Sequence, residues 1–294
     1  STRRAEGHAF DHGTQYFEAE DPRFTAWLQR FEAGGHVRRW TPHQVRIGQD
    51  GTLTPVTPSA DKLVFAPSMN TIGKALLAGR PQWQLYLDCG IERIDGGPGA
   101  WVLVAGEQQF GPFAQIILAI PPLQAAALLP PNIGFAAALA KARMQGCHSL
   151  MLGYEEAEAP ELAWTCAHFD DEMLGLATVN SAKPGRGGGF ALTLQTRHAW
   201  SEAHIEDDVA AVGAAMKRRF ADLTGWPVKA TGYERVHRWR YASTVTPAAT
   251  PAQPYLWDGE DGLAAIGDWC TGSQVEDAFL SGIGLAAALN KIIA

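Results

Sequence analysis

The sequence predicts a mixed α/β or α+β fold with two interleaved domains. Short strand-like segments alternate with a few helical ones, and a strand, a turn and a helix close the chain. The 294 residues suit about two domains of ordinary size. Hydrophobic residues make up 46% of the chain and charged residues 19%, which is a globular composition and argues against disorder or a coiled coil.

Four segments are predicted to be helices because apolar residues recur in them at three- and four-residue spacing. Gly79 ends the second of these segments, and Ser201 is the expected cap of the third. In chain order the predicted helices are 22–33, 69–79, 202–223 and 274–293.

Strands are predicted where apolar and polar residues alternate, or where a short apolar run is bounded by Gly or Pro. The run Phe113 to Ile120 is uniformly apolar, which is typical of a buried strand in a covered parallel sheet. The Pro-rich segment Pro247 to Pro254 predicts a linker or a crossing connection. The other predicted strands are hairpins within 36–66 and the segments 83–87, 90–94, 101–105, 147–154, 161–169, 173–179, 189–196, 228–241 and 262–267.

The charge balance limits the expected partners. Lys and Arg number 24 and Asp and Glu 31, a net charge of −7, so neither nucleic acid nor an anionic membrane is expected to bind. No apolar run reaches the roughly 18 residues of a membrane-spanning helix. The four cysteines form no Cys-x-x-Cys pair, and we expect a cytoplasmic protein without a disulfide scaffold.

The segment Ile266 to Glu276 is the most informative part of the chain. An apolar strand ends in Gly267-Asp268, a turn containing Gly272 follows, and a helix opens. Amides at the start of a helix attract anions, and the Asp268 carboxylate can accept hydrogen bonds from a polyol hydroxyl. The pattern therefore fits a cofactor site, and a simple turn capped by Asp268 fits it equally well.

Two glycine-containing motifs are more typical of a structural role than of ligand binding. Gly282 and Gly284 begin a Gly-x-Gly-x-x-Ala pattern, but this pattern lies inside the last helix, so close packing is the expected role. Lys183 and Arg186, in a glycine-rich loop, could meet a phosphate. A solvated loop is the favoured interpretation of these two cations.

Hydrolase and metal motifs are weak. The sequence contains neither a G-x-S-x-G elbow nor an H-E-x-x-H pair. Cys166 and His168, with Asp170 and Asp171 after them, could approach a metal, but coincidence is the favoured interpretation and no metal site is predicted. Candidates for a planar-ligand pocket, each of which alone is more typical of a core or rim, are Trp164, Trp200, Trp239 and Tyr241.

Several segments, taken in chain order, carry a family resemblance. They are Ser1-Thr2-Arg3-Arg4, Phe10 to Phe17, Ala119-Ile120-Pro121-Pro122 with Leu128-Leu129, Ser181 to Arg186, Trp200-Ser201 with His204, His237 to Ala242, and Gly267 to Cys270 through Val275-Glu276 to Gly282. The ordered set resembles the bacterial renalase-like flavin oxidoreductases, which are related to the flavin-containing amine oxidases.

The resemblance implies a two-domain fold of the hydroxybenzoate-hydroxylase type. One domain would be a Rossmann-like FAD-binding domain, and the other a mixed-sheet substrate domain that roofs the flavin ring. The FAD-binding domain would comprise 1–20, 67–122 and 255–294, and the substrate domain 21–66 and 123–254.

The resemblance also implies the site residues. The cofactor-binding set would be Arg3, Arg4, Asp11, His12, Gly13, Ile94, Gly267, Asp268, Gln274, Val275 and Glu276. The substrate pocket would be lined by Trp164, Trp239, Tyr241 and His148, the last standing where the family usually has Trp. No catalytic side chain is predicted, because the flavin itself would carry the chemistry.

The implied activity is that of an FAD-dependent oxidoreductase. It would accept a hydride from an amine or from a dihydronicotinamide substrate of the NAD(P) type, and pass electrons to dioxygen. The family's Gly-x-Gly-x-x-Gly strand–turn–helix and its ribose-binding Glu lie before the position of Ser1, so we expect a truncated cofactor domain. The alternative is a non-catalytic fragment that binds a nucleotide or other small molecule and has lost FAD binding.

Overall fold

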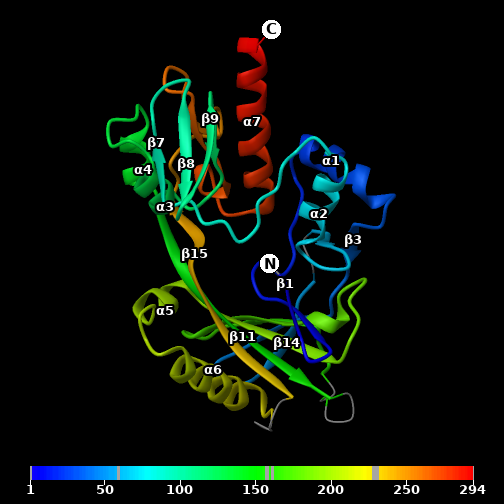
Figure 1. Ribbon diagram of the computed structural model, residues 1–294. Helices are drawn as coiled ribbons and strands as arrows, with labels where there is room; N and C mark the ends of the chain where they lie inside the picture. The colour runs from blue at the N-terminus through cyan, green and yellow to red at the C-terminus, as the bar shows by residue number, and fades with distance from the viewer. Residues whose placement is uncertain (1, 58–59, 156–158, 160–161, 227–231, 294) are drawn as a thin grey trace. The chain divides into compact units, whose positions relative to one another are not determined.

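The computed structural model describes residues 2–57, 60–155, 159, 162–226 and 232–293, and it shows a mixed α/β fold (Figure 1). The chain divides into two compact units. Unit 1 comprises Ser1–Arg80 and Gln145–Ala242, and unit 2 comprises Pro81–Met144 and Ser243–Ala294. These bounds differ from those of the two predicted domains, which divide the chain by cofactor and substrate binding; that functional division stays a prediction.

Unit 1 is built on a seven-stranded mixed sheet of order β15-β11-β14-β13-β12-β4-β5. β4 pairs in parallel with β12, whereas β13 pairs antiparallel with both of its neighbours. The strands are β4 (Gln44–Ile47), β5 (Leu53–Pro55), β11 (Arg143–Tyr154), β12 (Cys166–Phe169), β13 (Leu174–Val179), β14 (Phe190–Thr196) and β15 (Tyr233–Thr246). The boundaries between the units fall inside β11 and β15.

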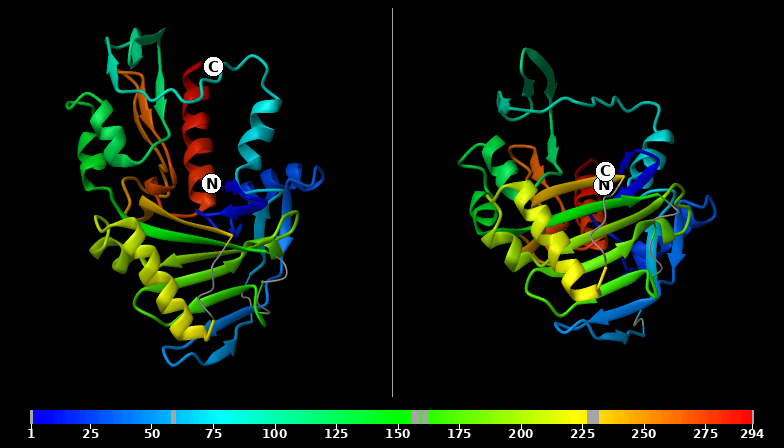
Figure 2. Two further views of the ribbon diagram at one scale, coloured as in Figure 1. Left: turned by 60° about the horizontal axis from the view of Figure 1, so that its bottom comes forward. Right: turned by 90° about the horizontal axis from the view of Figure 1, so that it is seen from below.

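Helices cover one face of this sheet and a hairpin lies on the other (Figures 1 and 2). The apolar side of α6 packs on the sheet through Val212, Met216 and Phe220. The remaining elements of unit 1 are the antiparallel pairs β1 (Thr2–Ala5) with β2 (His8–Asp11) and β3 (Val37–Trp40) with β6 (Lys62–Phe65), and the helices α1 (Pro22–Glu32), α2 (Thr71–Ala78), α5 (His198–Ala203) and α6 (Val209–Thr224).

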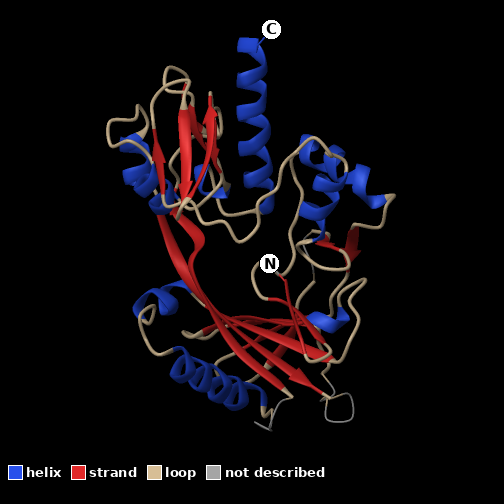
Figure 3. Ribbon diagram, in the orientation of Figure 1, coloured by secondary structure: helices blue, strands red, loops and turns tan. Residues whose placement is uncertain are grey.

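Unit 2 contains two three-stranded sheets and the long C-terminal helix (Figure 3). The first sheet is the antiparallel β7 (Arg93–Asp95), β8 (Trp101–Ala105) and β9 (Gln108–Phe113). In the second, β17 (Leu263–Ala265) pairs in parallel with β10 (Ile116–Leu118) and antiparallel with β16 (Leu256–Asp258). The helices are α3 (Pro122–Leu128), α4 (Ala136–Lys141) and α7 (Val275–Ile293).

Three of the four predicted helices are confirmed by α1, α2 and α7. The prediction of one helix over 202–223 is wrong, because the chain turns between α5 and α6. Asp208, whose carboxylate accepts from the Ala211 amide over 2.9 Å, caps α6. Ser201 is instead fully buried inside α5, where its hydroxyl oxygen lies within hydrogen-bond distance of His148 Nδ1.

The strand predictions hold best inside the large sheet, where β11, β13 and β14 confirm 147–154, 173–179 and 189–196. The segment 83–87 is not a strand: its side chains lie largely exposed. The predicted strand Phe113 to Ile120 is reduced to β10, which pairs in parallel with β17 but belongs to a mixed sheet. Ile117 is 47% exposed, so β10 is not buried along its whole length as predicted. Part of the predicted strand 228–241 lies outside the described residues.

Two further expectations concern single segments. Residues 247–254 form no helix or named strand, but they lie inside unit 2 and do not link the two units. The amides of Ala248 and Ala249 donate to the carbonyls of Trp269 and Cys270 over 3.2 and 2.8 Å, so the segment is a connection packed on the core of unit 2. In the described part of the chain, no helix combines the length and the apolar character needed to cross a bilayer.

Candidate functional site

The β1–β2 hairpin of unit 1 presents side chains to two different environments. Successive residues of an extended chain point to opposite sides. Phe10 and His12 share one side: Phe10 stacks on Tyr233 with ring centroids 5.2 Å apart, and His12 stacks on Trp239 at 5.3 Å. Asp11 takes the other side and meets two cations of the glycine-rich loop.

Asp11 is the centre of a buried ion cluster. Arg186 Nη2 and Nε donate to Asp11 Oδ2 over 2.6 and 3.1 Å, and Lys183 Nζ lies 3.4 Å from the same oxygen. Thr2 Oγ1 and the Met69 amide donate to Asp11 Oδ1 over 2.6 and 3.2 Å. The carboxylate thereby joins the hairpin, the segment before α2 and the glycine-rich loop.

This cluster holds two cations and one anion away from water, since the three side chains are at most 1% exposed. Burial alone would raise the pKa of the Asp11 carboxyl, but the charges of Lys183 and Arg186 outweigh burial and hold that pKa below its usual value. Burial lowers the pKa of Lys183 to about 8 although Asp11 opposes it. Lys183 is therefore the cation of this cluster that is most easily deprotonated.

Gln15 fixes the turn that follows the hairpin. Lys183 Nζ and Thr178 Oγ1 donate to Gln15 Oε1 over 2.9 and 2.6 Å. Gln15 Nε2 donates in turn to the carbonyls of Asp11 and Gly13 over 2.6 and 2.9 Å. The turn that sequence reasoning expects beside the flavin is therefore held rigidly by side chains from the sheet and the loop.

Three rings meet on the opposite side of the hairpin. His12 and His237 lie edge to face with centroids 4.9 Å apart, and His237 and Trp239 lie 4.2 Å apart. Trp239 Nε1 donates to the His12 carbonyl over 2.8 Å. Burial, aided by His237, lowers the pKa of His12 to about 4, and burial together with Arg3 lowers the pKa of His237. His12 is therefore neutral at pH 7.

His148, a predicted pocket residue, lies in a fully buried polar cluster on β11. Its amide donates to Thr196 Oγ1 over 2.9 Å and to Ser201 Oγ over 3.1 Å, and its Nδ1 lies 3.1 Å from that same Ser201 oxygen. Burial lowers the pKa of His148 to about 4, so the ring is neutral at pH 7.

The other predicted pocket residues differ in their surroundings. Trp164 is buried in the core and meets Phe220 edge-on at 6.4 Å, so it packs the sheet against α6. Tyr241 lies two residues after Trp239 on β15 and therefore shares its side of that strand.

In unit 2, β17 leads through Gly267 into a short turn at Asp268–Cys270 and on to α7. The Trp269 amide donates to Asp268 Oδ1 over 2.9 Å, as expected of a capping carboxylate. Burial raises the pKa of Asp268, and the charge of Asp277 adds to this. The Trp269 amide uses Oδ1, which leaves Oδ2 to accept from a hydroxyl group.

The start of α7 carries its own anion. Asp277 Oδ2 accepts from the amides of Ser273 and Gln274 over 3.0 and 2.8 Å. The predicted cofactor residue Gln274 thus has its amide engaged, while Val275 and Glu276 occupy the first turn of the helix. A cofactor contact from Gln274 would have to use its side chain.

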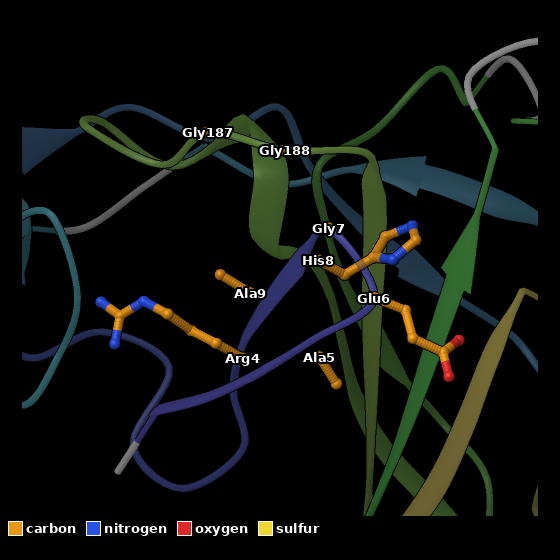
Figure 4. Close-up of a pocket in the computed structure, with 8 residues that line it drawn as sticks. All are labelled: Arg4, Ala5, Glu6, Gly7, His8, Ala9, Gly187 and Gly188. Carbon is orange, nitrogen blue, oxygen red and sulfur yellow. The ribbon is translucent and has the colours of Figure 1, made fainter.

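A shallow pocket of about 480 Å³ lies at the turn of the hairpin in unit 1 (Figure 4). Its lining residues are Arg4, Ala5, Glu6, Gly7, His8, Ala9, Gly187 and Gly188. Arg4 extends to one side, where its Nη2 donates to Ser68 Oγ over 3.1 Å, and Glu6 and His8 extend to the other. The charged groups do not converge, so the pocket by itself defines no chemistry.

The structure gathers the predicted residues into separate groups. Unit 1 holds Arg3, Arg4, Asp11, His12, Gly13, His148, Trp164, Trp239 and Tyr241, and unit 2 holds Ile94, Gly267, Asp268, Gln274, Val275 and Glu276. Ile94 lies in β7 and is partly buried against the core of unit 2. Whether these residues hold a cofactor stays a prediction.

The prediction that Lys183 and Arg186 lie in a solvated loop is wrong. Both side chains are buried because Asp11 offsets the cost of removing their charges from water. Sequence reasoning also missed Gln15 and His237. The available signal was Asp11 itself, since an acid inside an apolar strand requires buried donors.

The metal interpretation of Cys166 and His168 gains no support. Cys166 Sγ lies 4.0 Å from His168 Nε2, and burial raises the pKa of the thiol. Among the described residues, no three suitable side chains come together to hold a metal ion.

Comparison with solved structures identifies the fold. A structure from Exiguobacterium sp. 255-15, assigned as a protoporphyrinogen oxidase, superposes with a TM-score of 0.75 at 10% identity, over 97% of this chain and 90% of that one. Putrescine oxidase bound to putrescine matches with a TM-score of 0.69 at 9% identity, over 100% and 90%. Cyclohexylamine oxidase from Brevibacterium oxydans gives 0.56 at 14% identity, over 78% and 54%.

No family model matches the chain. At these identities the likeness establishes the fold alone, and this chain has the fold of these oxidases. The fold was predicted as mixed α/β, and that class is confirmed.

Proposed function

We propose that this chain is an FAD-dependent oxidoreductase of the renalase-like and amine-oxidase-like type. It would accept a hydride from a dihydronicotinamide-type or amine substrate and pass electrons to dioxygen. The observation that carries the proposal is the superposition on the Exiguobacterium structure and on putrescine oxidase, each over nine-tenths of its length. The ordered motifs of the sequence point to the same class independently.

Bound FAD would supply the redox chemistry, and the protein would supply orientation and electrostatics. The residues of unit 2 fit a polyol: Asp268 accepts from the Trp269 amide through Oδ1, has a second oxygen for a hydroxyl group, and lies where β17 runs into the turn before α7. In unit 1, the Asp11 cluster and Gln15 immobilise the Asp11–Gly13 turn. A turn held in this way would present a fixed backbone to a flat ring, which is the positioning that hydride transfer needs.

No glycine-rich Gly-x-Gly-x-x-Gly turn between a strand and a helix occurs in the 294 residues. A chain that binds a nucleotide or another small molecule without redox chemistry is therefore the second candidate. The two candidates differ in one measurable property, the affinity of this chain for FAD.

The deciding experiment is a calorimetric titration of this chain with FAD, followed by the visible spectrum of the complex. We expect stoichiometric binding and a yellow protein that bleaches when a dihydronicotinamide or an amine is added without oxygen. Asp268→Ala should weaken FAD binding about tenfold or more, the loss of one charge-assisted hydrogen bond. Asp95→Ala, an exposed carboxylate of the same unit, is the matched control. A colourless protein that ignores FAD would rule out the oxidoreductase and leave the binding module.

A further inference from the structure

The two sides of β15 carry cations in different settings. Arg238 and Arg240 lie on one side, where Glu206 balances them at 3.7 and 2.5 Å. Arg235, His237 and Trp239 alternate with them and so lie on the other side. This second side faces the β1–β2 hairpin, as the stacking of Trp239 on His12 shows.

The hairpin adds positive charge to that second side. Arg3 pairs across the hairpin with Phe10, whose ring stacks on Tyr233 of β15. The charge of Arg3 acts on both His12 and His237, and that of Arg235 acts on His237. The charged groups that lower the pKa values of these two rings are cations, which contrasts with the Glu206-paired side of the same strand.

Arg3 also has a donor without an acceptor. Its Nε–H group is buried and donates to no acceptor among the described residues. A buried donor of a charged group that lacks an acceptor is unfavourable, and a ligand oxygen placed there would remove that cost. On the same side of the hairpin, the indole N–H of Trp239 donates to the His12 carbonyl, which fixes the Trp239 ring against His12.

We propose that Arg3, His12, His237 and Trp239 form a subsite for an anionic group of the substrate, either a carboxylate or a phosphate. The Arg3 guanidinium offers the geometry that such oxygens prefer, and His237 can add a second donor. A protonated amine would be repelled by the same charges. This inference rests on the proposed function, because it names the class of substrate that the oxidoreductase would take.

The test is a titration of the full chain followed by NMR of ¹³C-labelled histidine rings, with potassium phosphate, sodium acetate and putrescine dihydrochloride as probes at constant ionic strength. Phosphate or acetate should raise the pKa of His237 saturably, because a bound anion favours the charged ring, and the stronger of the two identifies the anion class. Putrescine should leave that pKa unchanged. Arg3→Gln should weaken anion binding at least tenfold, whereas Arg240→Gln, on the other side of β15, should change it less than twofold.

Four outcomes would overturn the proposal. An unchanged His237 pKa in both anions, or equal binding by the Arg3→Gln variant, would show that no subsite exists. Saturable binding of putrescine at the same rings would reverse the substrate class. Loss of phosphate binding when FAD is added would assign the cations to the cofactor. These readouts need no turnover, so a failed FAD titration and a failed anion titration are distinguishable.

Discussion

Arg186 and Asp11 form an ion pair of 2.6 Å in which neither side chain is more than 1% exposed. Arg186 Nη1 also donates to the Phe65 carbonyl over 2.7 Å. One guanidinium therefore links the hairpin, β6 and the glycine-rich loop, which are far apart in sequence. The fixed position of the N-terminal hairpin follows from this pair more than from the two short strands themselves.

Removal of the Asp11 charge should strongly destabilise the protein. Asp11→Asn would leave Lys183 and Arg186 buried without their anion, which typically costs about 3–5 kcal/mol. The measurement is the free energy of unfolding in urea. Asp170→Asn, which breaks the pair with Arg46 at 2.7 Å on the surface, should cost at most about 1 kcal/mol. Equal losses in the two variants would show that burial of the Asp11 pair has no energetic consequence.

Lys183 should make stability depend on pH above neutrality. Its pKa is about 8 in the folded chain against a usual value of 10.5, so above pH 8 the unfolded chain holds more protons than the folded one. The free energy of unfolding should therefore rise between pH 8 and 10.5, by up to about 1.4 kcal/mol per pH unit. Below pH 8 both states are protonated and the dependence vanishes.

The matched experiment compares the protein with Lys183→Met in urea at several pH values. The charged and titratable groups around Lys183 are Asp11, Arg186 and the Cys166 thiol, and Gln15 is its neutral hydrogen-bond partner; the substitution changes none of them. We expect the difference in stability between the two proteins to change with pH only above about 8. A constant difference up to pH 10.5 would mean that Lys183 is not the group that loses a proton.

The sequence predicted the local elements well wherever periodicity was strong. The strands β13 and β14 follow from apolar spacing, because their buried residues belong to the core of unit 1. The helices α1 and α7 follow from the same signal, and their buried apolar residues are Phe24 and Leu28 in α1 and Leu285 in α7. The break before α6 was missed because Asp208 caps a helix inside a stretch whose apolar spacing looks continuous. Apolar spacing alone does not show where a capping residue starts a new helix within such a stretch.

The candidate site was predictable only in part, and for a physical reason. Asp11 and Lys183 are 172 positions apart, and nothing in either neighbourhood specifies the other. A buried acid demands a cation but not a particular one. The alternation of side chains along a strand places His237 and Trp239 on the same side of β15. It does not predict that the β1–β2 hairpin packs against that side.

The glycine-rich loop should tolerate a side chain at one position and reject it at the next. At Gly188 φ is +100°, and a Cβ atom would lie 2.2 Å from the Gly7 carbonyl oxygen. Gly188→Ala should therefore cost about 1–3 kcal/mol. At Gly187 a Cβ would meet nothing within 4 Å, so Gly187→Ala should change stability by less than about 0.5 kcal/mol. Thermal unfolding of the two variants checks this, and a Gly188→Ala protein as stable as Gly187→Ala would contradict the close approach of the hairpin.

Helix α7 offers a second matched pair of glycines. Gly284 packs as expected, since a Cβ there would lie 2.9 Å from Pro254 Cγ. The expected packing role is wrong for Gly282, where a Cβ would meet nothing within 4 Å. Gly282→Ala should stabilise the protein by about 0.5–1 kcal/mol through helix propensity, whereas Gly284→Ala should destabilise it by about 1–3 kcal/mol.

Urea unfolding of the two α7 variants measures the expected gain in stability for Gly282→Ala and the expected loss for Gly284→Ala. Titration of the same proteins with FAD measures whether cofactor affinity changes with stability. If the open side of α7 at Gly282 is where the flavin approaches, Gly282→Ala would gain stability and lose FAD affinity together. Gly284→Ala would change stability without a matching change in affinity at temperatures where it stays folded. A Gly282→Ala protein that is less stable than the parent would show that this side of α7 is packed. It would then leave no room for the flavin to approach the helix at Gly282.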